Sequence, residues 1–365
     1  MNFSLDIIPK INHSDIPAVD SYSILFQNGC YMQNHPPHQF PEGMIVGSFA
    51  TMCLQYASLC HDFFSKYNFS NDLSSILNAT HEGDGFFLFV PAGIKLSKPI
   101  QITNLFDEHS DVPLQTRNLV MMEAGSAIDL FIGDYTLSDE SCISNEVMTV
   151  AMGKEAYLEM VCLQKMNSVT RLDTHTTVQQ AASSRMKTHY ITMGGNTVHN
   201  SLKVTLSGQN AEHATTGLSL TQQNEHVDND VLIVHASPNC QSNQLFKNIL
   251  SDKSTGVFTG RIIVNRDAQK TTAYQRSSNI LLHPKAKMNI RPQLEIYADD
   301  VKCSHGATVG QLDAEALFYL RSRGIDESEA KKMLLHAFAR EIVDGISCTS
   351  LRESITILND GILTY

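Results

Sequence analysis

The sequence lacks several features that would place it in common protein classes. It has no tryptophan, only 18% of its residues are charged, and no apolar run approaches the about 18 residues of a membrane helix. Gly-x-Gly-x-x-Gly and Gly-x-x-x-x-Gly-Lys-Ser/Thr are both absent, so no dinucleotide or P-loop site is encoded. A net charge of −11, from 27 basic and 38 acidic residues, argues against nucleic-acid binding, which depends on clustered cations. Because the N-terminal residues also lack a signal-peptide pattern, we expect a cytoplasmic protein with no membrane contact.

The eight cysteines are scattered and include no Cys-x-x-Cys pair. This spacing indicates neither a structural zinc site nor a disulfide framework. We therefore expect reduced thiols, most of them buried as small hydrophobic side chains. Cys240, in the turn Ser237-Pro-Asn-Cys, is expected to be partly exposed.

The N-terminal region changes from an irregular to a helical pattern. Residues 1 to about 43 have no sustained period and predict an irregular leader, in which Asn34-His-Pro-Pro-His38 is typical of a turn rather than a ligand set. From Met44 to Tyr67, apolar residues recur at intervals of three and four and predict an amphipathic helix. A short helix at 71–78 is expected to follow, and Phe86–Val90 then has the composition of a strand.

The polar middle of the chain, from about 120 to 303, has no helical period of useful length. Turn-forming residues recur there about every 14.5 residues from Gly125 to Asp299, separated by strand-like strips such as Val257–Val264. Two such intervals, together about 29 residues, would make one coil of a flattened β-helix, in which each layer is buried by its neighbours. An antiparallel sandwich, with turns usually about 8–12 residues apart, is the alternative that this pattern leaves open.

The C-terminal region is helical. Leu312–Leu320 predicts a first helix that closes at Gly324, and Asp326 with Glu329 forms a capping box for a second helix that ends at Gly345. Such a helix pair either docks a partner or caps the open end of the β stack. We thus predict three parts, which are an N-terminal leader with a helical domain (1–85), a β core (86–307) and a C-terminal helical domain (308–365).

The best candidate for chemistry is the pair Cys303 and His305. In an extended strand, residues two apart point to the same face, so this thiolate and imidazole can reach one soft or borderline metal ion. Two ligands do not complete a tetrahedral site, and the others must come from elsewhere in the chain or from a partner subunit. Ordinary packing of a cysteine and a histidine is the alternative interpretation.

A second, weaker candidate is His226-Val-Asp228-Asn-Asp230. It brings two carboxylates to one strand face, as a β-helix enzyme acting on carbohydrate would require. Such an enzyme would need further carboxylates on neighbouring coils, and this alternative stays open from the sequence.

One stretch resembles a known family. Pro292–Gly310, continuing into Leu317–Ile325 and Ala330–Phe338, closely resembles the C-terminal part of the SufB/SufD family, whose members are scaffold subunits for iron–sulfur cluster assembly. Gly83–Ile100 is a second, less specific match. Cys-Ser-His-Gly-Ala-Thr-Val-Gly, which begins at Cys303, is similar to the SufD branch, because the SufB branch tends to read His-Glu-Ala-Thr there and carries an additional cysteine shortly upstream.

The resemblance implies a mainly β fold, a right-handed parallel β-helix flanked by N-terminal and C-terminal α-helical domains. It implies a scaffold and not an enzyme, which pairs its last strands with SufB and docks the ABC-type ATPase SufC through residues about 311–345, with ATP hydrolysis belonging to SufC. Cys303 and His305 would then be metal ligands at the subunit interface, holding a transient iron–sulfur cluster shared with the partner. A flavin bound to the complex, a SufB-like scaffold that holds the cluster by itself, and a homodimer formed through the same edge remain open.

Overall fold

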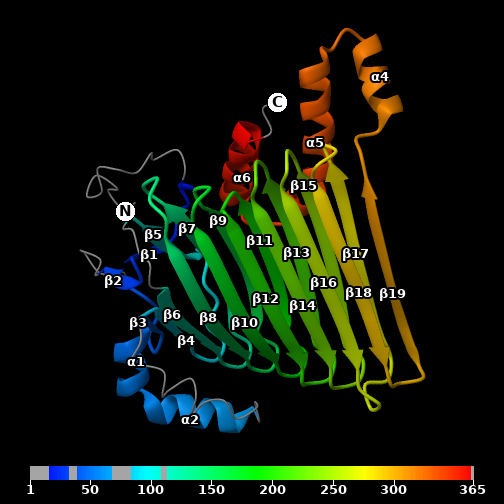
Figure 1. Cartoon of the computed structure of the whole chain (residues 1–365). Coiled ribbons are helices and arrows are strands. Elements are labelled where there is room, and N and C mark those ends of the chain that lie inside the picture. Colours follow the sequence, from blue (N-terminus) through cyan, green and yellow to red (C-terminus); the bar gives the residue numbers. More distant parts are fainter. Residues whose placement is uncertain (1–15, 33–38, 68–83, 108–112, 363–365) are drawn as a thin grey trace.

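The computed structural model describes residues 16–32, 39–67, 84–107 and 113–362, and it is built from two sheets whose strands alternate along the chain (Figure 1). Sheet A contains, in chain order, β1 (Tyr22–Gln27), β2 (Cys30–Met32), β5 (Ile100–Phe106), β7 (Ala127–Thr136), β9 (Tyr157–Lys165), β11 (Arg185–Met193), β13 (Glu212–Thr221), β15 (Gln241–Leu250), β17 (Thr271–Leu281) and β19 (Val301–Gly310). Sheet B contains β3 (Ile45–Ser48), β4 (Phe86–Val90), β6 (Leu114–Met122), β8 (Ile143–Met152), β10 (Arg171–Gln180), β12 (Thr197–Leu206), β14 (His226–His235), β16 (Thr255–Val264) and β18 (Lys287–Ile296). The described helices are α1 (Phe49–Gln55), α2 (Ala57–Lys66), α4 (Ala314–Ser322), α5 (Glu327–Val343) and α6 (Thr349–Ile362).

From β4 to β17 every strand pairs in parallel with the strand two places further along the chain, so the two sheets form a β-helix. Thr197 pairs with His226 and His226 with Thr255, which gives coils of 29 residues in this part of the solenoid. The predicted β-helix is therefore confirmed, and the antiparallel sandwich is excluded. No helix in the described ranges is long and apolar enough to cross a membrane.

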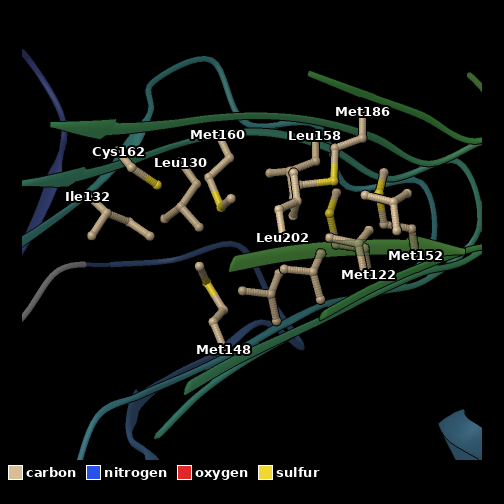
Figure 2. Close-up of a cluster of buried hydrophobic side chains, with 14 of the residues drawn as sticks. Met122, Leu130, Ile132, Met148, Met152, Leu158, Met160, Cys162, Met186 and Leu202 are labelled. Carbon is tan, nitrogen blue, oxygen red and sulfur yellow. The ribbon is translucent and has the colours of Figure 1, made fainter. Parts of the chain in front are cut away.

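The interior between the sheets is filled by aliphatic side chains and methionines from both sides (Figure 2). Met122, Met148 and Met152 come from sheet B and Met160 and Met186 from sheet A, and they are all buried. Because the thioether chain is unbranched and flexible, methionine fills the irregular space between stacked coils. Closer to the C-terminal end the inward positions become polar, with Thr215, Gln244 and Gln275 in neighbouring coils.

The N-terminal segment corrects two predictions. β1 and β2 lie inside the predicted irregular leader, and β1 extends sheet A by pairing with β5, so the leader interpretation is wrong for these residues. The predicted helix from Met44 to Tyr67 begins instead as β3 and is divided at Tyr56 into α1 and α2, which pack their apolar face on β4 and β6. The proposed helix at 71–78 and the Asn34–His38 run lie outside the described residues.

The C-terminal helices cover the outer face of sheet A (Figure 1). The first two agree with the predicted helix pair, and the Asp326 side chain caps α5 by accepting the backbone N–H groups of Ser328 and Glu329. α5 and α6 bury Leu335, Ile342 and Ile355 against outward-facing residues of β9, β11, β13 and β15. By contrast, α4 buries none of its side chains and contacts α5.

The cysteines behave largely as expected. Five of the eight are buried, which are Cys53, Cys60, Cys142, Cys162 and Cys240, and all eight are free thiols. The expectation that Cys240 is partly exposed is wrong, because the residue is fully buried and its thiol donates to the carbonyl of Gly208 at 3.2 Å. Residues 237–239 of the preceding turn reach the surface. Cys240, which follows them, already points into the interior of the next coil.

Candidate functional site

Cys303 and His305 lie on β19, the outermost strand of sheet A. This strand pairs on one side with β17, where Cys303 is opposite Ala273 and His305 opposite Gln275. Its other edge has no neighbour in the sheet order, and β18 ends sheet B in the same way. The pair therefore lies at the open end of the solenoid, away from the N-terminal helices (Figure 1).

Both side chains belong to the inward-facing side of sheet A. Paired residues in neighbouring strands share a face, and Ala273 and Gln275 are 0% and 3% exposed inside the solenoid. Cys303 packs against the small apolar cluster around Ala273 and is partly buried, whereas His305 is exposed. They therefore occupy interior positions that are uncovered because no further coil follows them.

The Cys303 thiol is not activated in the isolated chain. Its partial burial raises its pKa, and a backbone hydrogen bond from Ala273 opposes this effect only in part. The neutral thiol is consequently favoured near neutral pH, and a bound metal ion would have to displace its proton.

The ligand set is incomplete in this chain. Within the described ranges, no group of three or more His, Cys, Asp or Glu side chains is arranged to hold a metal ion. Cys303 and His305 are thus two donors on an open edge, and a tetrahedral iron or zinc site would need at least two more.

Sequence reasoning missed Gln275 and Gln244, the next two inward positions behind His305. Both amides are at most 3% exposed, and neither their oxygen nor their nitrogen atoms have a hydrogen-bond partner in the described structure. Gln275 reaches across the interior to Gly260, where an added Cβ would lie within 1.6 Å of the amide nitrogen. Glycine at position 260, in the middle of β16, was the available signal, because it makes room for a large side chain on the opposite sheet.

The second candidate lies elsewhere. His226, Asp228 and Asp230 face outward on sheet B, where Asp228 Oδ2 is 3.4 Å from His199 Nδ1 and raises the pKa of that histidine through this hydrogen bond. In the neighbouring coils Asp228 is paired with His199 and Val257, and Asp230 with Ser201 and Thr259. No carboxylate is stacked on either aspartate, so the arrangement does not meet the requirement for a carbohydrate-active enzyme.

A further group of ionisable residues that the sequence did not indicate lies inside the solenoid. Asp134 and Glu146 are buried beside Cys162, next to a small cavity of about 20 Å³. Burial raises the pKa of Asp134 to about 7, and burial followed by repulsion from Asp134 raises that of Glu146 well above its ordinary value. Asn104 donates to Asp134 at 2.7 Å. At neutral pH Glu146 therefore retains its proton and Asp134 is only partly ionised, so the two groups do not form a pair of charged ligands.

The C-terminal helices present an apolar surface. On α4, Phe318 and Tyr319 are 74% and 57% exposed, and the Arg323 guanidinium lies 5.3 Å from the Tyr319 ring centroid. A groove of about 890 Å³ separates α5 from α6, with Met333 and Ile357 on its walls. Exposed aromatic residues next to arginine are typical of protein-binding surfaces.

Comparison with known proteins agrees with this geometry. Residues 105–338 match the family model described as "SUF system FeS cluster assembly, SufBD core domain", and residues 4–102 match "SufBD protein N-terminal region". The iron–sulfur cluster assembly protein SufD of Escherichia coli is 34% identical over 220 residues, which cover 60% of this chain and 52% of that protein. A SufBD family protein of Synechocystis is 27% identical over 360 residues, covering 96% of this chain and 79% of the relative.

The chloroplastic protein ABCI7 of Arabidopsis thaliana is 30% identical over 328 residues, covering 87% of this chain and 68% of that protein. The family resemblance read from the Cys303 region is thereby confirmed, and the match extends through most of the solenoid. The chain belongs to the SufBD family of iron–sulfur cluster assembly proteins.

Proposed function

We propose that this chain is a SufD-like scaffold subunit that pairs with a SufB-like paralogue and docks a SufC-like ABC ATPase. A nascent iron–sulfur cluster is built or held as cargo at the interface between the two scaffold subunits. The observation that carries the proposal is the position of Cys303 and His305 on the uncovered inward face of the last strand. We place the complex in the cytoplasm, without nucleic-acid or membrane partners.

Pairing with a paralogue follows from the chemistry of the open end. The free edges of β18 and β19 present unpaired backbone N–H and C=O groups, which favour the addition of further strands. Ile296, Tyr297 and Val309 add exposed apolar area at this end, and the inward residues Met288 and Ile290 are only partly buried. A partner with the same fold would continue both sheets and bury the interior that β18 and β19 leave open.

Cluster binding follows from the ligand chemistry. Thiolate and imidazole both ligate iron in iron–sulfur centres, and two donors from each of two subunits would complete such a site. Because cysteine binds a metal as the thiolate and histidine as the neutral imidazole, we expect cluster loading to fall as the pH is lowered. The chain itself has no catalytic role in this proposal, and ATP hydrolysis belongs to the docked ATPase.

Docking of the ATPase is assigned to the C-terminal helices. α4 stands clear of the solenoid with Phe318 and Tyr319 exposed, so these side chains are available to a partner (Figure 1). Replacing Phe318 with Asp should abolish binding of the ATPase and leave folding intact, because α4 buries no side chain in the free chain. Unchanged binding by F318D in a pull-down would contradict this assignment.

The main test is co-expression of the chain with its SufB-like and SufC-like partners. Cys303→Ala and His305→Ala should lower the iron and sulfide content of the purified complex. Cys30→Ala and His61→Ala are the matched controls, because both side chains are exposed on the N-terminal part of the chain and remote from the edge. Normal cluster content in C303A and H305A would refute the ligand assignment.

The same preparation separates the remaining alternatives. A SufB-like scaffold that holds the cluster by itself predicts stoichiometric iron and sulfide on the isolated chain after anaerobic reconstitution. A homodimer predicts that the isolated chain associates through β19, and that the SufB-like partner competes with this association. A flavin in the complex would be visible in its absorption spectrum.

A further inference from the structure

One residue of α5 connects the C-terminal helices to the strands nearest the candidate site. The Glu341 carboxylate forms ion pairs with Lys247 Nζ on β15, at 2.6 Å, and with the Arg276 guanidinium on β17. Lys247 is almost fully buried, donates a second hydrogen bond to the carbonyl of Phe338 at 2.8 Å, and lies 4.5 Å from the Phe338 ring centroid. A single carboxylate therefore joins the helix to two adjacent strands of sheet A.

Through Arg276, the ion pairs of Glu341 lie close to the candidate site. Arg276 is paired in register with Gly306, the residue that follows His305 on β19. Gln275, its neighbour in the sequence, is paired with His305 itself. The ion pair thus contacts β17 from outside the sheet, at the residue next to the one that is paired with His305.

The chain connectivity makes this contact part of a closed loop. β19 ends at Gly310 and α4 begins at Ala314, so three residues join the candidate strand to the helices. α4 packs on α5, and α5 returns to β17 through Glu341. α5 is also held on β13 and β15 by its buried apolar side chains, so Glu341 adds the link to β17, the strand that pairs with β19.

The other ion pairs that the structure describes for these helices do not extend to the sheet. Arg321 with Glu327, Lys331 with Glu327, and Arg340 with Asp344 join helix residues to one another. The Glu341 carboxylate stays ionised because the hydrogen bond from Lys247 and the charges of Lys247 and Arg276 lower its pKa against the effect of burial. Its charge is thus available at every pH at which the complex would operate.

We propose that Glu341 is a positioning residue, through which movement of α4 and α5 is transmitted to β19 and sets the exposure of Cys303. The inference rests on the proposed docking of an ATPase on α4. With Glu341 in place, α5 is fixed to β15 and β17, and a pull on α4 is borne by β19 against β17. Without it, α5 keeps its apolar contacts with β13 and β15 but loses its link to β17, and the displacement is no longer transmitted to β19.

The test measures nucleotide-dependent exposure of Cys303 in the assembled complex. Cys30 and Cys348, which are not buried, are replaced by Ser, and the rate of maleimide alkylation at Cys303 is followed by mass spectrometry with and without ATP. With Glu341 intact we expect ATP to change this rate by about five-fold or more, the lower end of typical coupling between sites. In Glu341→Gln the change should fall below about two-fold, with unchanged complex stoichiometry and ATPase rate.

Matched variants distinguish transmission from a loss of folding. Asp344→Asn removes one carboxylate from the end of the same helix and breaks an exposed pair within it, so it should keep the full response. Arg276→Gln should reproduce the Glu341→Gln result, Arg276→Lys should restore much of the response, and the double variant Glu341→Gln with Arg276→Gln should add no further loss. Arg276 is more than half exposed, so its replacement leaves the fold intact.

The proposal is overturned if Glu341→Gln or Arg276→Gln keeps the full ATP-dependent change, or if ATP does not change Cys303 exposure in the intact complex. In both cases the purified complex still supports the proposed function, because its assembly is measured in the same sample. If the unsubstituted chain binds neither partner, the proposed function fails and this inference fails with it.

Discussion

Glu159 is the residue whose replacement should most weaken the attachment of the C-terminal helices. Its carboxylate, 2% exposed on β9, accepts the backbone N–H of Ser347 at 2.7 Å and the Tyr157 hydroxyl at 3.0 Å, and lies 3.4 Å from His189 Nε2. Ser347 belongs to the connection between α5 and α6, so the carboxylate holds this turn on the sheet. Replacement of Glu159 with Gln keeps the shape of the side chain and removes its charge.

The size of the effect follows from the pKa of Glu159. Burial alone would raise it, but hydrogen bonds involving His189 and Ser347 outweigh burial and lower the pKa from 4.5 to about 2. At 1.36 kcal/mol per unit, the ionised form is favoured in the folded chain by about 3 kcal/mol. Since a neutral amide can still accept the Ser347 N–H, we expect Glu159→Gln to cost about 2–3 kcal/mol.

The pH dependence has a definite sign. A carboxyl group with a depressed pKa contributes stability above its unfolded value of about 4.5 and loses it as the pH falls toward about 2. The difference between the parent chain and Glu159→Gln should therefore be constant from about pH 5.5 to 8 and shrink below about pH 4. Urea denaturation followed by circular dichroism measures the difference, and hydrogen exchange locates it in α5 and α6.

Asp344→Asn is the matched control, because it breaks an exposed pair between Arg340 and Asp344 that is expected to contribute at most about 0.5 kcal/mol. If Glu159→Gln destabilises the chain no more than this control, or if its effect persists unchanged at about pH 3, the charge of Glu159 does not hold the helices and the reasoning is refuted.

Three further predictions concern the interior and the open edge. Asp134→Asn should stabilise the chain at about pH 8 by about 1–3 kcal/mol. The reason is that the folded state retains a proton that the unfolded state releases as the pH rises from about 4 through about 7. Denaturation at about pH 5 and about pH 8 measures the gain in stability, and a gain that is equal at both would contradict this reasoning. Gln275→Met should raise the stability of the isolated chain by about 1 kcal/mol, because it removes a buried amide that has no partner; a lower urea midpoint would show that this amide is satisfied in solution. Cys303→Ala should leave stability within about 1 kcal/mol in the same assay, because the side chain is only partly buried, and a larger loss would indicate a packing role.

The repeating part of the fold was predictable because it depends on local signals. Each coil needs tight turns, and the chain meets this need with Gly125 and with residues such as Ser183 and Asp252, which have φ values of 68°, 56° and 51°. These positions coincide with turns predicted from composition alone. Strand-like segments between regularly spaced turns are compatible with few folds, and a stacked coil is one of them. The parallel, in-register pairing of the strands in the structure shows that the chain adopts this fold.

The N-terminal strand was not predictable from the same kind of signal. β1 has only six residues, and its partner begins at Ile100, which pairs with Tyr22 across a long stretch that includes two helices. A short segment of this kind acquires its conformation from the edge it joins rather than from its own pattern. α6 was also missed: no helix was predicted after the second helix, which was expected to end at Gly345, although the buried residues Leu351 and Ile355 of α6 are four apart.

The candidate site was likewise only partly predictable from the sequence. Alternation along a strand was enough to place Cys303 and His305 on one face, but it could not say that this face is the inside of the solenoid, which depends on pairing with Ala273 and Gln275. Cys303 and His305 are the inward residues of the last coil, and the inward residues in register with them on the preceding strand of sheet A are Ala273 and Gln275. Within the described residues no third His, Cys, Asp or Glu joins the pair, and for this reason the proposed function assigns the remaining ligands to a second subunit.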